Sequence, residues 1–246
     1  VLLTLGREMA AYAEAFSRDR WRIYKCEERL RVVNLGGTAV GTGINTHREF
    51  GARVAAKLSA MAGVEFREAP NHFESQAAQD ACVQASGCLR TIAVSLMKIA
   101  NDIRWMGSGP RCGIGEIRLP ETQPGSSMMP GKVNPVIAES LIQVCAQAIG
   151  NDSAITLGGL SGNFELNVMM PLIAHNLLQS IEVEANAAKA LAEKCVEGIR
   201  ADEERCLLLA ERSLALITAL APKIGYDRAA EIAKEAAESD KSSREL

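Results

Sequence analysis

The sequence predicts an all-α protein, built as an elongated bundle of long helices. Apolar residues recur at alternating intervals of three and four over long stretches, which is the pattern of a buried helix face. No stretch of the sequence shows the alternating, β-branched pattern that a sheet strand of useful length requires. Helices of about 30 residues would be roughly 45 Å long, so we expect them to pack side by side as rods.

Three helices are predicted in the first part of the chain, over about residues 2–34, 48–62 and 75–105. A connector rich in glycine, residues 36–43, separates the first two. The stripe of the first helix consists of Leu2, Leu5, Met9, Tyr12 and Phe16. The strongest stripe belongs to the third helix and consists of Ala85, Leu89, Ile92, Leu96, Ile99 and Ile103.

A long loop over residues 107–131, rich in glycine, proline and serine, follows this helix and is expected to be functional because of its length. The next helix is predicted from Pro135 to about residue 158, with Asn134 as its cap. Another follows over about 166–196 with a kink at Pro171, and shorter helices follow over about 202–221 and 227–239. We expect a central bundle domain over 1–198, incomplete at its N-terminal side, and the start of a truncated, small C-terminal helical domain over 199–246.

Composition argues against several classes of protein. The net charge of −3 gives no basic surface for a nucleic acid backbone, so we expect no nucleic acid partner. Apolar runs such as residues 206–210 are far shorter than the ~20 residues that span a bilayer, so we expect no membrane partner. The seven cysteines are scattered without ligand spacing, which indicates reduced core residues rather than a disulfide framework or zinc site.

The segment Gly125-Ser126-Ser127-Met128-Met129-Pro130-Gly131-Lys132-Val133-Asn134-Pro135 combines groups suited to removing a proton next to a carboxylate. That reaction needs a base, together with cations or donors that stabilise the charge developing on the carboxylate. Ser126 lies in a pliable turn, Lys132 supplies positive charge, and Asn134 supplies amide donors at a helix start. Taken singly, these residues also fit a solvated linker, a surface charge and a helix cap.

This segment resembles the signature of the fumarase/aspartase superfamily, Gly-Ser-Ser-x-Met-Pro-x-Lys-x-Asn-Pro, at every fixed position. Further similar segments are residues 34–43, Lys98-Ile99-Ala100-Asn101-Asp102, Ser108-Gly109-Pro110-Arg111 and Gly150-Asn151-Asp152, so the resemblance covers essentially the whole chain. It implies Ser126 as the catalytic base, with Ser127, Lys132 and Asn134 binding substrate. It also implies that Glu139 partners a catalytic histidine of another subunit, although an exposed helix acid is the alternative.

Within this family, the resemblance favours class II fumarase, which hydrates fumarate to malate without metal or organic cofactor. Residues 71–74 and 162–165 follow the fumarase form, since aspartases tend to have Gly-Gln where this chain has Gly162-Asn163. Aspartate ammonia-lyase remains the alternative within the enzyme class. His47, His72 and His175 are scattered, and we interpret each as a surface or core histidine without an assigned role.

The resemblance also implies a homotetramer in which each active site takes residues from three subunits. The family's Thr-His pair and its serine/threonine and asparagine motifs are absent here, Arg7 stands where relatives usually have Gln, and the chain starts without Met. We therefore expect this chain to be part of a longer protein and inactive alone, which leaves a non-catalytic helical assembly module as a further alternative. The expected compartment is the cytoplasm, or the mitochondrial matrix in a eukaryote.

Overall fold

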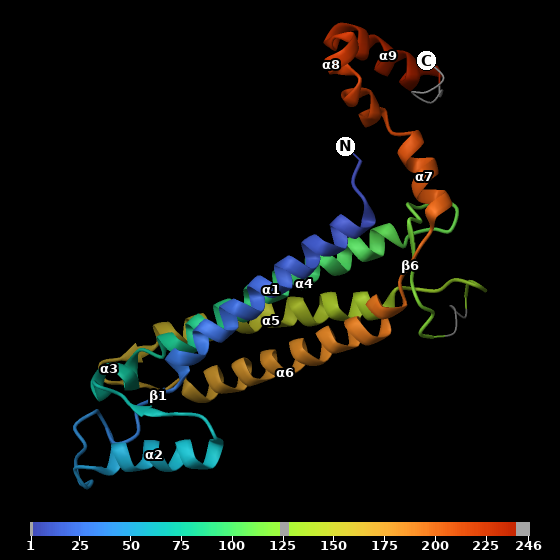
Figure 1. Ribbon diagram of the computed structural model, residues 1–246. Helices are drawn as coiled ribbons and strands as arrows, with labels where there is room; N and C mark the ends of the chain where they lie inside the picture. Colours follow the sequence, from blue (N-terminus) through green and yellow to red (C-terminus); the bar gives the residue numbers. More distant parts are fainter. Residues whose placement is uncertain (1, 124–127, 240–246) are drawn as a thin grey trace. The chain divides into compact units, whose positions relative to one another are not determined.

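The predicted all-α class is confirmed by a computed structural model that describes residues 2–123 and 128–239 (Figure 1). Its strands, among the described residues, are two residues long each. The chain divides into two compact units, which we call the bundle unit, residues 14–100 and 139–191, and the terminal unit, residues 1–13, 101–138 and 192–246. This division follows packing rather than chain order, and the predicted boundary at residue 198 stays a prediction.

Four long helices dominate the fold: α1 (Leu5–Leu30), α4 (Asp80–Met106), α5 (Val136–Leu160) and α6 (Met170–Lys194). Within the bundle unit they lie side by side (Figure 1), and a core cluster joins all four through Cys26, Ala85, Ile155, Ile173 and Leu177. Small residues allow the helices to approach closely. A Cβ on Gly158 would lie 2.7 Å from the Ile173 side chain, and one on Gly159 would lie 2.7 Å from that of Val83.

Buried hydrogen bonds also hold the bundle unit together. Asp152 on α5 accepts hydrogen bonds from Ser86 Oγ at 2.7 Å and from Arg90 Nη1 at 2.8 Å, both on α4. Asn151 donates through Nδ2 to Gln179 Oε1 and Ser180 Oγ on α6, each at 3.0 Å. Because unpaired buried polar groups destabilise a protein, these pairs fix which faces of α5 meet the two neighbouring helices.

The glycine-rich connector and its surroundings form one end of the bundle unit. Strand β1 (Val32–Val33) pairs in parallel with β2 (Arg67–Glu68), and the segment of chain that connects the two strands contains α2 (Phe50–Ala62). Gly36 and Gly41 have φ angles of 110° and 96°, which favour glycine. Gln76, on the short helix α3 (His72–Ala77), donates through Nε2 to Thr38 O at 3.0 Å and so secures the connector.

Two helix boundaries predicted in the bundle unit were wrong. The helix predicted over 75–105 is divided into α3 and α4, because Gln79 has a φ angle of 54° that a helix cannot accommodate. The first helix ends at Leu30 rather than at residue 34, because the following residues pair as β1. Both errors lie where the apolar stripes no longer constrain the backbone.

The helix predicted from residue 166 begins at Met170 instead. Residues before it form a hairpin of β4 (Gly162–Asn163) and β5 (Leu166–Asn167). Asn167 is fully buried and accepts the N–H of Met169 at 2.8 Å, while donating to Gly158 O at 3.0 Å. Pro171 is therefore the second residue of α6, where its missing N–H has no helical partner, and the predicted kink was wrong.

In the terminal unit, β3 (Ile117–Arg118) pairs antiparallel with β6 (Arg200–Ala201), which follows the 3-10 helix η1 (Val196–Gly198). The helix predicted over 202–221 was wrong as a single element: α7 (Glu203–Glu211), the 3-10 helix η2 (Leu214–Ala219) and α8 (Ala221–Ile224) replace it. The first break lies at Arg212 and Ser213, where the Ser213 hydroxyl accepts the N–H of Ala215 and caps η2. The last element, α9 (Tyr226–Ser239), agrees with its prediction within one residue.

Across the described part of the chain, each helix is too short or too polar to pass through a bilayer. All seven cysteines are free thiols; three of them, Cys26, Cys145 and Cys195, are buried, whereas Cys112 is exposed, so its interpretation as a core residue was wrong.

Candidate functional site

The predicted catalytic segment ends in a turn that leads directly into α5. Ser126 and Ser127 lie outside the described residues, so their predicted roles stay predictions. Lys132 is exposed and donates its backbone N–H to Met129 O at 3.1 Å, and Gly131 has a φ angle of 80°. Asn134 is half-buried, and its carbonyl accepts the N–H of Val136 at 2.8 Å. The structure thus brings Lys132 and Asn134 to the start of one helix.

This helix start has the electrostatic character that an anion requires. The first N–H groups of a helix point away from it without helical partners, and the helix dipole places partial positive charge there. The Lys132 ammonium adds a full charge four residues before α5 begins. A carboxylate bound beside this turn would therefore meet an ammonium, an amide and a helix N-terminus, which is a set of donors suited to a substrate dianion.

Glu139 is half-buried in the first turn of α5, where its negative charge also complements the helix dipole. The position of Glu139 therefore fits both interpretations, a helix acid that stabilises α5 and a catalytic residue. Its predicted partner, a histidine of another subunit, would come from outside this chain, so the catalytic role stays a prediction.

The three histidines lie apart from the catalytic turn in the chain. His47 is exposed, and its Nδ1 accepts the N–H of Glu49 at 3.2 Å. His72 is half-buried, with Nε2 3.4 Å from Glu68 Oε1 and 3.3 Å from Leu35 O. His175 is exposed on α6. These local contacts agree with the structural interpretation of His47 and His72. Among the described residues, no three potential metal ligands form a group that could hold an ion.

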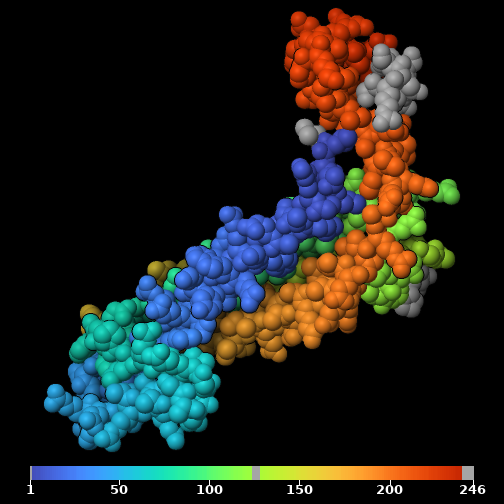
Figure 2. Space-filling view, viewed as in Figure 1, coloured from blue at the N-terminus to red at the C-terminus, as the bar shows by residue number. Residues whose placement is uncertain are grey.

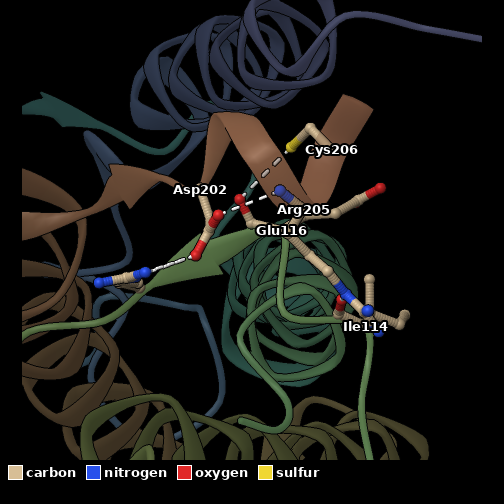
Figure 3. A network of polar contacts seen from close by, with 6 residues as sticks. Ile114, Glu116, Asp202, Arg205 and Cys206 are labelled. Atoms are coloured by element: carbon tan, nitrogen blue, oxygen red, sulfur yellow. Dashed lines mark hydrogen bonds and ion pairs between the residues drawn. The ribbon is translucent and has the colours of Figure 1, made fainter. Parts of the chain in front are cut away.

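A polar network that the sequence did not reveal anchors residues 113–118, which precede the catalytic segment (Figure 3). The Arg205 guanidinium donates to Ile114 O through Nε and to Gly113 O through Nη2, each at 2.8 Å. Asp202 accepts hydrogen bonds from Arg118 Nη2 at 2.7 Å and from the Arg205 N–H at 3.1 Å. The partners of the side-chain bonds from Arg205 and Arg118 are separated by more than 80 residues, so no local sequence pattern indicated these bonds.

Charge stabilises this network further. The Arg118 guanidinium, followed by the Arg205 backbone N–H, holds the pKa of Asp202 below its usual range. The Asp202 N–H also donates to Glu116 O at 2.9 Å, in line with the β3 and β6 pairing. Ser108 completes the anchorage, since its hydroxyl accepts the N–H of Ile114 at 3.0 Å. Residues 113–118 are therefore held by hydrogen bonds with Ser108, Asp202 and Arg205 within the terminal unit.

The other segments that resemble the superfamily contribute polar groups with structural partners. Tyr12 donates its hydroxyl to Asp102 Oδ2 at 2.8 Å, and burial raises the pKa of Tyr12 above its ordinary value. Asn101 Oδ1 accepts from Arg104 Nη1 at 3.2 Å. These contacts give Asn101 and Asp102 structural partners within the terminal unit.

Comparisons with known proteins agree with these observations. Residues 2–150 match the family model described as "Lyase", and residues 216–246 match the model described as "Fumarase C C-terminus". The chain is 51% identical over 243 residues to the class II fumarate hydratase of Neisseria meningitidis, covering 99% of this chain and 53% of that protein. It is 52% identical to the Mycobacterium tuberculosis enzyme of the same name, covering 100% of this chain and 52% of that protein.

Solved structures give the same picture. The fumarate lyase:delta crystallin of Brucella melitensis superimposes with a TM-score of 0.93 at 49% identity, covering 99% of this chain and 53% of that one. The class II fumarase of Schistosoma mansoni gives a TM-score of 0.95 at 36% identity, covering 99% of this chain and 54% of that one. The chain thus spans about half the length of the relatives it matches.

Proposed function

The chain belongs to the lyase family of the fumarase/aspartase superfamily, and we propose that the whole protein is a class II fumarate hydratase that interconverts fumarate and (S)-malate. The observation that carries this proposal is identity of about half over nearly the whole chain to class II fumarate hydratases. The complete signature over residues 125–135 supports the same reaction. The proposed substrate is therefore a small dicarboxylate.

In the proposed mechanism, the Ser126 alkoxide removes a proton from C3 of malate. The electron pair of the broken C–H bond moves into the adjacent carboxylate, giving a carbanion-type intermediate with extra negative charge on that group. The ammonium of Lys132, the amide of Asn134 and the hydroxyl of Ser127 stabilise this charge, aided by the start of α5. The electron pair then forms the double bond as the C2 hydroxyl takes up a proton and leaves as water.

A serine hydroxyl is a weak acid, so Ser126 needs help to act as a base. Nearby donors lower the free energy of its alkoxide relative to the hydroxyl, and exclusion of bulk water strengthens the interaction of these donors with the alkoxide. We propose that these conditions arise when subunits assemble as a homotetramer and share residues at each active site. In this assembly Glu139 orients a histidine of another subunit, and this chain alone has no turnover.

The working compartment that we propose is the cytoplasm, or the mitochondrial matrix in a eukaryotic source. One relative is a mitochondrial fumarate hydratase from Rhizopus oryzae, which is 51% identical over 234 residues. The others described above are bacterial proteins. The same reaction would serve fumarate metabolism of the tricarboxylic acid cycle in either compartment.

The test is an assay of the whole protein with malate and with aspartate as separate substrates. Both reactions yield fumarate, whose conjugated double bond is followed by ultraviolet absorbance. We expect turnover with malate and none with aspartate. Turnover with aspartate alone would replace the proposal by an aspartate ammonia-lyase. Turnover by the 246-residue chain alone would contradict the requirement for the rest of the longer protein.

A further inference from the structure

Pro120 is the last half-buried residue before the proposed base in the described part of the chain, and residues 121–123, which follow it, are exposed. Ser126 comes six residues after Pro120, and six residues of chain span at most about 20 Å. The point at which Pro120 is held therefore limits the positions that the Ser126 hydroxyl can reach.

The pairing of β3 with β6 carries the chain to this point. Arg118 pairs with Arg200 at the end of β3, so the same antiparallel register, continued by two residues, puts Pro120 opposite Gly198. Proline has no N–H to donate, which suits a position beyond the end of the strand. Figure 2 shows orange residues of this region packed against green residues of the connection between α4 and α5.

Gly198 leaves no space for a side chain where it meets Pro120. A Cβ on Gly198 would lie 3.0 Å from both Cβ and Cγ of Pro120, whereas carbon atoms in contact lie about 3.5–4.0 Å apart. Gly198 is itself fixed by η1, where its N–H donates to Cys195 O at 3.3 Å and the N–H of Ile199 donates to Val196 O at 3.1 Å. The proline ring therefore rests directly on a fixed backbone.

The residue before Pro120 is seated in a similar way. Leu119 is half-buried, and a Cβ on Gly107, which follows α4 directly, would lie 3.0 Å from Leu119 Cγ. Two successive side chains thus pack against the backbone of two glycines. Because close-packed contacts of this kind leave little free space, a single added methyl group displaces the chain.

We propose that Gly198 is a positioning residue for the reaction, which supports Pro120 and so sets where the Ser126 hydroxyl meets C3 of the substrate. The inference rests on the proposed function and adds to it a residue that acts through Pro120. Lys132 and Asn134 lie at the other end of the connection, next to the start of α5. A shift of Pro120 should therefore misplace the base and leave substrate binding intact, and a misplacement of about 1 Å can lower a rate about a hundredfold.

Side chains of increasing size at residue 198 test the inference in the whole protein. Gly198→Ala should lower kcat with malate about threefold and Gly198→Val at least about tenfold, because the larger side chain displaces Pro120 further. KM should stay within about twofold. Circular dichroism and the unfolding midpoint identify folded protein, to which kcat is normalised. Glu197→Ala, which removes an exposed side chain from the same 3-10 helix, is the matched control and should leave both constants unchanged.

Two double variants distinguish positioning from a general loss of structure. Pro120→Ala alone should lower kcat about threefold, but combined with Gly198→Ala it should do no worse than either single change, because the added methyl group occupies space that the ring vacates. In a Ser126→Ala background, Gly198→Ala and Gly198→Val should lower the residual kcat less than about twofold, because no base remains to be misplaced. If Gly198→Val does not fold, Gly198→Ala and its double variants carry the test.

Three results would overturn this inference alone while the wild-type protein turns over malate. The first is a wild-type kcat in the folded Gly198 variants. The second is a raised KM at unchanged kcat, which would place the effect on substrate binding. The third is an equal loss of kcat with and without Ser126, which would show that Gly198 acts independently of the base. A wild-type protein without malate turnover would overturn the proposed function, and the inference with it.

Discussion

Two pairs of residues that resemble the superfamily differ in how far they are buried, one pair in the bundle unit and the other in the terminal unit. In the bundle unit, Asn151 and Asp152 are buried, and side chains of neighbouring helices satisfy their polar atoms. In the terminal unit, Lys132 is exposed and Asn134 half-buried in a turn at a helix start. The contrast indicates that the first pair maintains the fold, while the second is available for a substrate.

Lys132→Met is the strongest test of this contrast. Loss of the ammonium that we propose stabilises charge on the substrate carboxylate should lower kcat/KM by about two to three orders of magnitude. Because the side chain is exposed, the unfolding midpoint should stay the same. Steady-state kinetics with malate and thermal unfolding measure both effects. Arg111→Met, which removes an exposed cation from the same connection between α4 and α5, is the control and should retain activity within a few-fold.

Glu184 marks the exception in the bundle unit, a buried carboxylate without a partner among the described residues. Burial raises its pKa in the folded chain from 4.5 to about 7. At pH values between these two pKa values, the folded chain binds a proton that unfolding releases. The free energy of unfolding of the 246-residue chain in dilute solution should therefore fall as pH rises from 4.5 through 7. The loss above pH 7 should approach about 3 kcal/mol. Urea unfolding at several pH values measures it, and Glu184→Gln should flatten the profile.

Asp152→Ala should act on stability and not on chemistry. The change leaves Ser86 and Arg90 of α4 without their acceptor and should lower the free energy of unfolding by about 2 kcal/mol. Turnover per folded molecule should stay near that of the wild type. Urea unfolding together with active-site-normalised kinetics checks this, and exposed Ser153→Ala is the neighbouring control. A large fall in kcat at full folding would mean that the bundle unit also takes part in the chemistry.

Arg205→Met should produce the smallest effect, confined to the anchored segment of the terminal unit. Loss of its bonds to Gly113 O and Ile114 O should lower local stability by about 1 kcal/mol. Hydrogen exchange at the amides of Ile114 and Asp202, which donate to Ser108 Oγ and Glu116 O, should become about fivefold faster. Arg200→Met, two residues before Asp202, is the control, and unchanged exchange in Arg205→Met would remove the anchoring role.

The sequence predicted the long helices because their burial is periodic. The stripe from Ala85 to Ile103 became the buried face of α4, with Leu96, Ile99 and Ile103 all at most 4% exposed. The sequence-based prediction failed where a single residue changes the direction of the backbone. The φ angle of Gln79, the hairpin before α6, and the separate short elements after Glu211 depend on contacts that no periodic pattern contains.

The candidate site divides in the same way. Lys132 and Asn134 were found from the sequence because the signature is contiguous, and the helix start they precede was predicted within one residue. Arg205 and Asp202 were missed, since their partners lie about 90 and 84 residues away in the chain.

Deuterium incorporation provides the most direct test of Ser126 as the group that exchanges the C3 proton, as base toward malate and as proton donor in the hydration of fumarate. The whole protein and its Ser126→Ala variant are incubated with fumarate in D₂O, and the malate formed is followed by proton NMR. Anti addition predicts malate with a single deuterium at C3, formed at least about a thousandfold more slowly by the variant. Malate formed by the variant at near the wild-type rate, or no malate from the wild-type protein, would contradict the account.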